Sequence, residues 1–437
     1  MSNSIYLNEV DASEVHRTIK NFKNKSTSDT RISALKIANE SYSFTTVLAN
    51  IINKSFKEGV FPEQLKTAGV VPIHKEGSKT DVSNFRPISL LKTFSKIFEK
   101  VMHVRILSFL ESNNSLYEMQ YGFRPGRSCE HALLNAQNDI LSSLSRHQIS
   151  LLLLIDFSKA FDMVDHSVLL TKLDHYGIRG SALQWIKSYL INRKQHVTVN
   201  GTKSTSNIMN YGVPQGSILG PLLFIIYIND IPEIAQYAKF ILYADDANII
   251  ISANTIEEVH DQLLELINNL LYWVNCNGLA LNLKKTKYMI FSKSKTDLPS
   301  PLIISNTLIE RKEEARFLGV IIDESLNWTR HIRTVISKMA RYIGLMYKIK
   351  KLLPLSARLQ IYHSLVQSHI NFCILVWGFS CRTNIDAIFA KQKIGIRAVI
   401  PGFVNYKYKN GKLPGHKTNK RFLWKMYILR HSCVTRD

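Results

Sequence analysis

The hydrophobic pattern of the chain changes near residue 325. Before that point, stretches with a helical repeat alternate with short apolar runs that predict strands. The helical stretches cover residues 41–56, 91–110, 130–144, 164–176, 182–190 and 256–274. The strand-like runs cover residues 69–73, 149–155, 195–199, 240–251, 287–292 and 317–322. From residue 331 only helical repeats remain, at 331–352, 356–375 and 385–399, so we expect a mixed α+β part followed by an all-α part.

Local signals sharpen this outline. Asp11 and Glu14 have the spacing of a capping box, in which Asp11 accepts from first-turn amides and Glu14 reaches back, so a short helix is expected there. The alternating residues 195–199 run into an Asn-Gly pair, which predicts a β-hairpin. The run 149–155 is almost wholly apolar and ends on Asp156, as is typical of a strand buried on both faces.

The net charge of +22, from 56 basic and 34 acidic residues, is unevenly distributed. Residues 327–437 contain 21 Lys and Arg and only two acids, whereas the preceding part is nearly neutral. Hydrophobic residues make up 45% of the chain, which is typical of a folded protein rather than a disordered one. The basic C-terminal quarter predicts a polyanionic partner, either nucleic acid or an acidic membrane surface.

Several classes of protein are disfavoured. The first residues lack the basic and apolar regions of a secretory signal. The apolar runs 151–155 and 222–228 are far shorter than the ~20 residues of a membrane span. The five cysteines form no CxxC pair and show no zinc-ligand spacing with histidine. We therefore expect an intracellular protein of the cytoplasm and nucleus, with reduced thiols and no membrane partner.

Three aspartates are the candidates for chemistry. Asp156 ends a predicted strand, and Asp245 and Asp246 occupy a turn between two apolar strands. If these strands are neighbours in one sheet, the three carboxylates converge, and a cation such as Mg²⁺ would relieve their repulsion. The alternative is that Asp245 and Asp246 form a polar turn while Asp156 caps a helix.

The residues around these aspartates resemble the palm motifs of reverse transcriptases, most closely those of non-LTR (LINE-type, jockey-like) retrotransposons. The palm strings are LIDFSKAFD at 154–162, GVPQGSILGP at 212–221 and YADD at 243–246. Supporting strings follow the family's order: FRPISLL at 85–91, QYGFRPGRS at 120–128, GLALNLKKTK at 278–287 and FLG at 317–319. The resemblance implies an α+β right-hand polymerase, with fingers and palm of antiparallel sheet plus helices and an all-α thumb.

The resemblance also implies a domain organisation. Residues 1–55 would be an N-terminal helical extension packing on the fingers, 56–322 the fingers and palm, 323–400 the thumb and 401–437 a basic tail. The partners implied are an RNA template, a DNA primer or target DNA, and dNTPs. Relatives usually carry an endonuclease ahead of the polymerase, so we expect that activity from a missing upstream region or in trans.

Catalytic and metal-binding roles follow from the same resemblance. Asp156, Asp245 and Asp246 would be catalytic and, with the Phe157 carbonyl, would hold two Mg²⁺ ions, for which Mn²⁺ is a possible substitute. Phe161 would lie under the sugar of the incoming nucleotide and exclude a 2′-OH. An ordinary core aromatic is the alternative for Phe161, and the two roles are compatible.

Nucleotide-binding roles are implied for Lys75, Arg86, Phe161, Gln215 and Gly216. Lys75 and Arg86 match cations that clamp the triphosphate, with solvated surface charge as the alternative. Gln215 and Gly216 belong to a Pro-Gln-Gly string that would let the backbone approach the nucleotide. Lys285 is the candidate general acid for pyrophosphate, although its neighbours Lys284 and Lys287 are equally close in sequence.

Template or primer contacts are implied for Arg124, Arg127, Phe317, Leu318, Gly319, Arg330, Arg333 and Arg341. The first two arginines would meet template phosphates, and residues 317–319 resemble the primer grip, whose alternative is a core strand ending in a turn. The last three lie on a basic helical stretch suited to tracking a duplex backbone. Asp162 follows Phe161, and we expect it to be structural, capping the next helix.

The function implied is RNA-directed DNA polymerase. An RNA-dependent RNA polymerase is a rival, but it would be expected to show Gly-Asp-Asp and a small residue at position 161. A second rival is a decayed or domesticated copy that only binds nucleic acid. Intact aspartates argue against decay of the site without demonstrating turnover.

Overall fold

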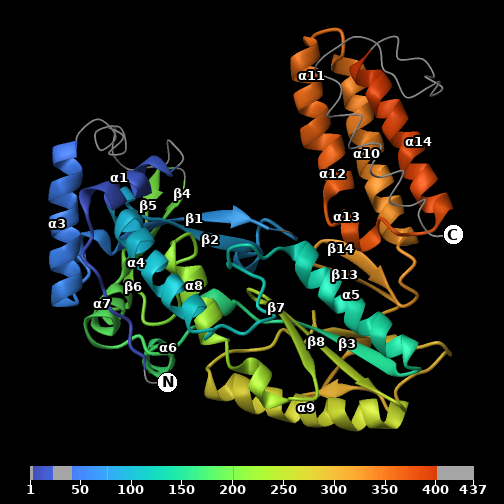
Figure 1. Cartoon of the computed structure of the whole chain (residues 1–437), viewed down its shortest axis with the longest axis horizontal. Coiled ribbons are helices and arrows are strands. Elements are labelled where there is room, and N and C mark those ends of the chain that lie inside the picture. Colours follow the sequence, from blue (N-terminus) through green and yellow to red (C-terminus); the bar gives the residue numbers. More distant parts are fainter. Residues whose placement is uncertain (1–2, 23–41, 76, 200, 401–437) are drawn as a thin grey trace.

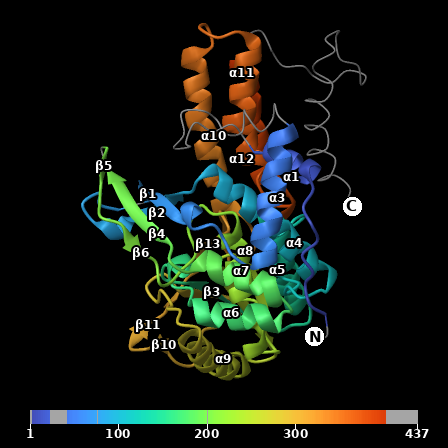
Figure 2. The ribbon, with the colours of Figure 1, turned by 90° about the vertical axis from the view of Figure 1, so that its left-hand side faces the viewer.

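The computed structural model describes residues 3–22, 42–75, 77–199 and 201–400 (Figure 1). Helices alternate with strands as far as Asp323, and the elements after Trp328 are helical. Helices at the C-terminal end of the described chain project from the palm sheet on the side opposite α9, Ile256–Cys276, in both views (Figures 1 and 2). The predicted tail 401–437 and part of the predicted extension 1–55 lie outside the described residues.

The palm is built on a five-stranded sheet in the order β12-β9-β3-β8-β7. Its central strand β3 pairs antiparallel with both β8 and β9, whereas β12 pairs parallel with β9. Successive β3 side chains point to opposite faces of the sheet and both faces are buried, which explains the nearly continuous apolar run. The strand bounds are β3 Ile149–Asp156, β7 Lys239–Tyr243, β8 Asp246–Ala253, β9 Lys287–Phe291 and β12 Glu310–Arg311.

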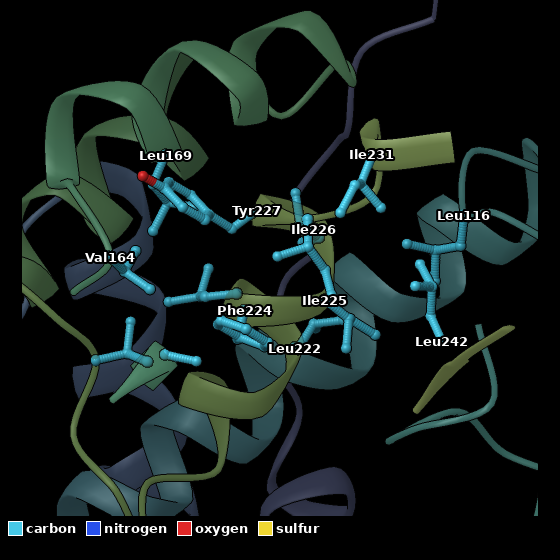
Figure 3. Close-up of a cluster of buried hydrophobic side chains, with 14 of the residues drawn as sticks. Leu116, Val164, Leu169, Leu222, Phe224, Ile225, Ile226, Tyr227, Ile231 and Leu242 are labelled. Carbon is cyan, nitrogen blue, oxygen red and sulfur yellow. The ribbon is translucent and has the colours of Figure 1, made fainter. Parts of the chain in front are cut away.

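One face of this sheet packs on a large core that contains helix α8, Leu219–Tyr227. Because neighbouring elements surround this helix, it is apolar on every side. Figure 3 shows its Phe224 and Tyr227 near Val164 and Leu169. No helix among the described residues is long and apolar enough to cross a membrane. The other helices of this core are α1 Ala12–Lys20, α3 Tyr42–Glu58, α4 Thr93–Ser112, α6 His166–His175, α7 Gly180–Leu190 and α9.

The fingers contain a second sheet in the order β2-β1-β4-β5, with β6 also paired to β4. Strands β4 and β5 pair antiparallel, which confirms the hairpin predicted after residues 195–199. Strands β1 and β2 form another antiparallel pair, which Figure 2 shows beside β4. The strand bounds are β1 Thr67–His74, β2 Phe85–Leu90, β4 Lys194–Val199, β5 Thr202–Lys203 and β6 Asn207–Ile208.

Helix α1 begins where the capping pattern places it, but only half of the predicted box forms. The Asp11 carboxylate accepts from the Glu14 amide at 2.7 Å, as expected for an N-cap. Glu14 does not reach back to the helix start. Its carboxylate accepts from the Arg105 guanidinium of α4 at 2.6 Å and 3.0 Å, because this half-buried cation offers a charge-assisted bidentate partner.

The opposite face of the palm sheet packs on α5, Cys129–Ser145, and on a hairpin of β13, Glu314–Phe317, and β14, Val320–Asp323. A single strand over 317–322 is therefore a wrong prediction. The chain reverses at Leu318 and Gly319, where φ is +46° and +89°. A small hairpin of β10, Ile303–Ile304, and β11, Thr307–Leu308, precedes it.

The thumb consists of helices, as predicted, but one of them is not continuous. Helices α10, Thr329–Ile349, and α14, Arg382–Val399, lie side by side. The predicted helix 356–375 is broken, because Phe372 turns to an extended ψ of 114° and Cys373 adopts φ +50°. Its pieces are α11 Leu355–Tyr362, a π-helical turn His363–Gln367, α12 Ser368–Asn371 and α13 Ile374–Trp377.

Candidate active site

The three candidate aspartates lie at one end of the central palm strands. Asp156 is the last residue of β3 and Asp246 the first residue of β8, and the pairing register places them directly opposite each other. Side chains of such cross-strand partners stand on the same face of a sheet, with Cβ atoms about 5 Å apart. Asp245 belongs to the turn that joins β7 to β8. The prediction that these two strands are neighbours in one sheet, with Asp156 and Asp246 at the same end, is therefore correct.

Asp156 is fixed by contacts from the loop before β9. Its Oδ2 atom accepts from the Asn282 Nδ2 at 3.0 Å, and its backbone carbonyl accepts from the Asn282 amide at 2.8 Å. The Lys285 ammonium lies 3.6 Å from the same Oδ2 atom. Asp156 caps no helix, so that part of the alternative is wrong, whereas Asp245 does lie in a polar turn. Lys284 and Lys287 line the adjoining cavity, but Lys285 is the lysine paired with the carboxylate.

Asp246 experiences the repulsion expected of clustered acids. Its side chain reaches solvent, yet partial desolvation, then the Asp245 and Asp156 carboxylates, raise its pKa to about 6, and the Lys75 and Lys285 cations offset part of this effect. The two negative neighbours therefore favour the protonated, neutral form of the Asp246 carboxyl. Any cation held between these groups would favour their ionised forms.

The donors suit a hard divalent cation, although they do not form a complete site. Among the described residues, no group of three or more His, Cys, Asp or Glu side chains is arranged to hold a metal ion. Carboxylate oxygens are nevertheless the ligands that Mg²⁺ prefers, and it usually completes its shell with water and substrate phosphates. The Phe157 bridge to Leu281 uses the Asp156 carbonyl and the Ser158 amide. In antiparallel geometry this leaves the Phe157 carbonyl directed toward the other side.

The Pro-Gln-Gly loop is held against the fingers sheet. The Ser89 amide donates to the Gln215 carbonyl at 2.7 Å, and a Cβ on Gly216 would come within 2.8 Å of the Ser89 carbonyl. Gly216 also adopts φ +111°, so this position requires glycine. The loop thus approaches strand β2 as closely as two backbones can.

The Gln215 side chain has an internal partner that the sequence did not reveal. Its Nε2 donates to Asp162 Oδ1 at 3.0 Å, and burial raises the pKa of Asp162. Asp162 was expected to cap the next helix, and this prediction is wrong. Asp165 caps α6, because its side chain accepts from the Ser167 amide at 2.7 Å. Asp162 instead orients a residue of the predicted nucleotide pocket.

A buried acid that sequence reasoning missed also supports this loop. Glu99 of α4 is fully buried, and it accepts from the Ile218 amide at 2.8 Å and the Ser95 hydroxyl at 2.8 Å. The Ile218 amide directly precedes α8 and directly follows the loop. The sequence does contain a signal for this residue. Glu99 stands among the apolar positions of the helix expected over residues 91–110, where a buried charge without a partner would be very costly.

Phe161 lies in an aromatic group with Phe123 and Phe224. Its ring stacks on Phe224 with centroids 4.6 Å apart, and Phe123 meets it edge-on at 6.4 Å. Phe123 is half-exposed and adopts φ +58°, an uncommon conformation for an aromatic residue. Sequence reasoning missed Phe123, because a positive φ at a non-glycine residue leaves no signal in composition or periodicity.

The fingers cations lie at the open end of the β1–β2 pair. The Lys75 amide donates to the Asn84 carbonyl at 2.9 Å, just beyond the last β1 residue. Arg86 lies on β2 opposite Ile73, and both cationic residues are exposed. The Lys75 cation is close enough to Asp246 to lower the pKa of that carboxyl.

The two arginines of the QYGFRPGRS string differ in how far their side chains are engaged within the protein. Arg124 is nearly buried and binds Glu111 with two hydrogen bonds of 2.8 Å and 2.6 Å, while also donating to the Tyr117 carbonyl. A template contact is therefore not supported for Arg124, whose donors are satisfied within the protein. Arg127 lies over the Tyr121 ring at 5.6 Å and donates to the Glu118 carbonyl at 2.6 Å.

The predicted primer-grip residues form the turn of the β13–β14 hairpin. Phe317 is buried, which matches the core-strand alternative, while Leu318 and Gly319 make the turn, against which Phe372 packs. A cavity of about 380 Å³ separates this hairpin from the aspartates. Its lining includes Asp156, Asp246, Phe317, Leu318 and the cations Lys284, Lys285, Lys287, Lys312 and Arg316. The hairpin therefore faces the end of the sheet that contains Asp156 and Asp246 across a charged cavity.

The predicted thumb contacts are presented to solvent. Arg330, Arg333 and Arg341 are exposed on α10, and their spacing keeps them on its outer side. Arg330 forms one ion pair, with Glu314 at 3.4 Å, between two exposed side chains. Such a pair contributes little stability, so Arg330 can exchange Glu314 for a phosphate at low cost.

Comparison with known proteins now assigns the family. The family model described as "Reverse transcriptase (RNA-dependent DNA polymerase)" matches residues 73–322, which contain all three aspartates. The chain belongs to the reverse transcriptase family. This membership confirms the predicted right-hand polymerase class, and the structure supplies its α+β palm and helical thumb. Reverse transcriptases generally use divalent metal ions for nucleotidyl transfer.

The relatives are proteins of mobile elements. The chain is 31% identical over 367 residues to the "RNA-directed DNA polymerase from mobile element jockey" of Drosophila funebris, covering 80% of this chain and 39% of that protein. It is 29% identical over 371 residues to the "Probable RNA-directed DNA polymerase from transposon BS" of Drosophila melanogaster, covering 80% and 40%. These matches confirm the predicted resemblance of this reverse transcriptase to jockey-like elements. The chain spans about two fifths of the length of these curated relatives.

A solved structure also matches, at a low level. Apo telomerase from Candida tropicalis, truncated from its C-terminal domain, is 14% identical, with a TM-score of 0.41. The match covers 65% of this chain and 59% of that one. We draw nothing from so distant a likeness, and the family assignment rests on the sequence matches.

Proposed function

We propose that the chain is the RNA-directed DNA polymerase of a non-LTR retrotransposon, extending a primer 3′-OH on an RNA template with dNTPs. The observation that carries this proposal is the cross-strand pair Asp156–Asp246, with Asp245 in the adjoining turn. Like charges directly opposite in a sheet are destabilising, so the arrangement costs stability. A role in holding cations for phosphoryl transfer accounts for that cost.

Asp156, Asp245, Asp246 and the Phe157 carbonyl would hold two Mg²⁺ ions in this proposal, with Mn²⁺ as a possible substitute. When bound, such ions supply an activated primer hydroxyl and neutralise charge on the transferring phosphate. The hard oxygen donors and the mutual repulsion around Asp246 support this assignment. Asn282 keeps the Asp156 carboxylate oriented for it.

The protein side chains would bind and orient the nucleotide. Phe161, braced by Phe224, would contact the sugar and leave no room for a 2′-OH. Lys75 and Arg86 would hold the triphosphate, and the backbone at Gln215–Gly216 would lie close to the nucleotide. Lys285 would give its proton to the departing pyrophosphate, and its ammonium lies within 3.6 Å of Asp156 in support of this.

The nucleic acid would lie between palm and thumb. Arg330, Arg333 and Arg341 supply exposed charge for the duplex backbone, and Arg127 and the 317–319 turn would contact template and primer. The proposed site of action is the cytoplasm and nucleus. An endonuclease would come from an upstream region of a longer protein or in trans.

The test is primer extension. Purified protein receives an RNA template, a DNA primer, Mg²⁺ and either dNTPs or rNTPs. We expect dNTP incorporation that falls by roughly 10³-fold or more in Asp245→Asn/Asp246→Asn. A matched control is Asp261→Asn, an 84% exposed aspartate on α9, which should leave extension unchanged.

Two results would contradict the proposal. Extension no greater than in the double variant, with duplex binding retained, would favour a protein that only binds nucleic acid. Incorporation of rNTPs but not dNTPs would favour an RNA polymerase.

A further inference from the structure

The segment around Gln120 lies directly against the turn Ala244–Asp245 between β7 and β8, here called the catalytic turn. The Leu242 amide donates to the Met119 carbonyl at 3.0 Å, and the Tyr121 amide donates to the Leu242 carbonyl at 2.8 Å. These bonds place the segment as a short parallel addition to the edge strand β7. The QYGFRPGRS string therefore enters the palm at the point where the chain turns toward Asp245.

The catalytic turn contains an amide that its own hairpin does not satisfy. Strands β7 and β8 pair up to Tyr243 and Asp246, so Ala244 and Asp245 form a two-residue turn outside the ladder. Ala244 is buried and adopts φ +55°, at a position where such turns favour glycine. A buried amide without an acceptor is costly, and a strained residue needs its surroundings to hold it.

Gln120 supplies the missing acceptor. Its side chain is 1% exposed, and its Oε1 atom accepts from the Gly122 amide at 2.9 Å and from the Ala244 amide at 3.3 Å. The Nε2 atom of the same side chain is buried with no hydrogen-bond partner among the described residues. The contribution that the structure shows for this glutamine is therefore its oxygen, which bridges two backbone segments.

The residues next to Gln120 let its segment lie this close to the Ala244–Asp245 turn, and they hold the segment in that position. A Cβ on Gly122 would overlap the Ala244 nitrogen and come within 3.0 Å of the Tyr243 carbonyl carbon, so only glycine fits. Tyr121 is buried, accepts a hydrogen bond from Asn135 and lies under the Arg127 guanidinium. The segment is thus anchored on the side away from the turn.

We propose that Gln120 is a positioning residue that fixes the Ala244–Asp245 turn, and through it the Asp245 carboxylate, for metal-dependent catalysis. The inference rests on the proposed function for its kinetic consequence, although the positioning itself concerns only the turn. The hydrogen bonds of the buried Gln120 side chain are made with the Gly122 and Ala244 amides. Loss of its oxygen leaves the Ala244 amide unsatisfied, so the turn opens more often and Asp245 occupies its place for less of the time.

The test compares two glutamine-to-methionine substitutions in the full chain. Gln120→Met keeps the length and approximate volume of the side chain and removes the acceptor oxygen. Gln392→Met is the matched control, because Gln392 is also 1% exposed and also has one amide atom without a partner, but it lies in thumb helix α14. Should Gln120→Met fail to fold, Gln120→Asn withdraws the oxygen from the turn while keeping a polar side chain.

Two readouts separate positioning from general destabilisation. Hydrogen exchange of a peptide covering residues 240–247 should become about tenfold faster in Gln120→Met, and should not change in Gln392→Met. Primer extension should show a kcat about tenfold lower and a half-activating Mg²⁺ concentration several-fold higher, with duplex affinity unchanged. The control should keep the wild-type Mg²⁺ dependence even where its melting temperature falls.

The outcomes are distinct for the two proposals. Folded Gln120→Met with wild-type exchange of the turn and wild-type Mg²⁺ dependence would overturn the role of Gln120. Wild-type protein without extension would contradict the proposed polymerase function, and the exchange measurement alone would then decide whether Gln120 fixes the turn.

Discussion

In the palm, three aspartates lie at the end of strands that are otherwise nearly all apolar, whereas thumb helix α10 contains five Lys and Arg residues and no Asp or Glu. In the palm, the Asp156 carboxylate is held in place by Asn282 and Lys285. The thumb arginines Arg330, Arg333 and Arg341 are exposed, and Arg330 has one long ion pair. A few oriented charges suit chemistry, which depends on exact placement. Many exposed charges of one sign suit the binding of a polyanionic backbone, which depends on the electrostatic field.

This contrast predicts that geometric changes in the palm affect rate and that charge changes in the thumb affect binding. Among these geometric changes, Gly122→Ala should have the largest effect, because its Cβ would displace the Ala244–Asp245 turn. We expect extension to fall by about 100-fold, with duplex affinity retained. Gly344→Ala, in open space on α10, is the thumb control and should extend normally. A wild-type rate for Gly122→Ala would show that the turn tolerates displacement.

The sugar contact should show the next largest effect. Phe161→Ala removes the ring that Phe224 braces, so ribonucleotides gain access to the site. We expect the preference for dNTPs over rNTPs, measured as the ratio of kcat/KM values, to fall by about 10–100-fold. Phe161→Tyr should preserve it. Equal discrimination in the alanine variant would assign Phe161 to the core alone.

Charge removal in the thumb should alter affinity and leave chemistry unchanged. In the triple variant Arg330→Gln/Arg333→Gln/Arg341→Gln, the slope of log K for duplex binding against log salt concentration should become shallower by about 2–3. Each lost phosphate contact contributes about 0.9 to this change. The kcat at saturating duplex should not change. The same number of charges removed from the fingers side, as Lys20→Gln/Lys54→Gln/Lys57→Gln, should leave the slope unchanged. A reduced kcat in the arginine variant would mean that the two regions are not separable.

The smallest effect concerns stability and pH. The pKa of Asp246 in the folded protein is raised to about 6. Between about pH 4 and 6 the folded protein therefore binds more protons than the unfolded chain. The free energy of unfolding falls as the pH rises through that window. Asp246→Asn should therefore raise the free energy of unfolding at pH 7 by about 1 kcal/mol or less, given the solvent exposure of the side chain. Chemical denaturation without metal should show no gain at pH 4. A gain that is equal at both pH values would contradict the role of charge repulsion.

Much of the fold could be predicted from the hydrophobic pattern, because burial is regular along most elements. The strand ending at Asp156 is apolar throughout because both of its faces are buried, and the basic helix α10 buries one face. The failures arose where a break leaves no periodic signal. Leu318 and Cys373 adopt positive φ without being glycine, so one expected strand became a hairpin and one expected helix became several pieces.

The candidate site could be predicted as a set of residues, but their partners could not. The pairing of Asp156 with Asp246 depends on strand register, and the Lys285 contact on a loop more than 120 residues away in sequence. Arg124 shows the limit in the other direction. Its cationic side chain suggested a phosphate, yet Glu111 satisfies it within the fold. A charged residue in a motif indicates that it needs a partner of opposite charge. It does not indicate whether that partner is another residue of the protein or a bound phosphate.

The most direct test of the division between palm and thumb is Asp156→Asn, which preserves the shape of the side chain and removes its charge. Single-turnover extension and duplex affinity should be measured on the same preparation at two salt concentrations. We predict that extension falls by roughly 10³-fold while the duplex affinity and its salt dependence stay at wild-type values. Extension near the wild-type rate, or a loss of duplex affinity that parallels the loss of extension, would contradict this account.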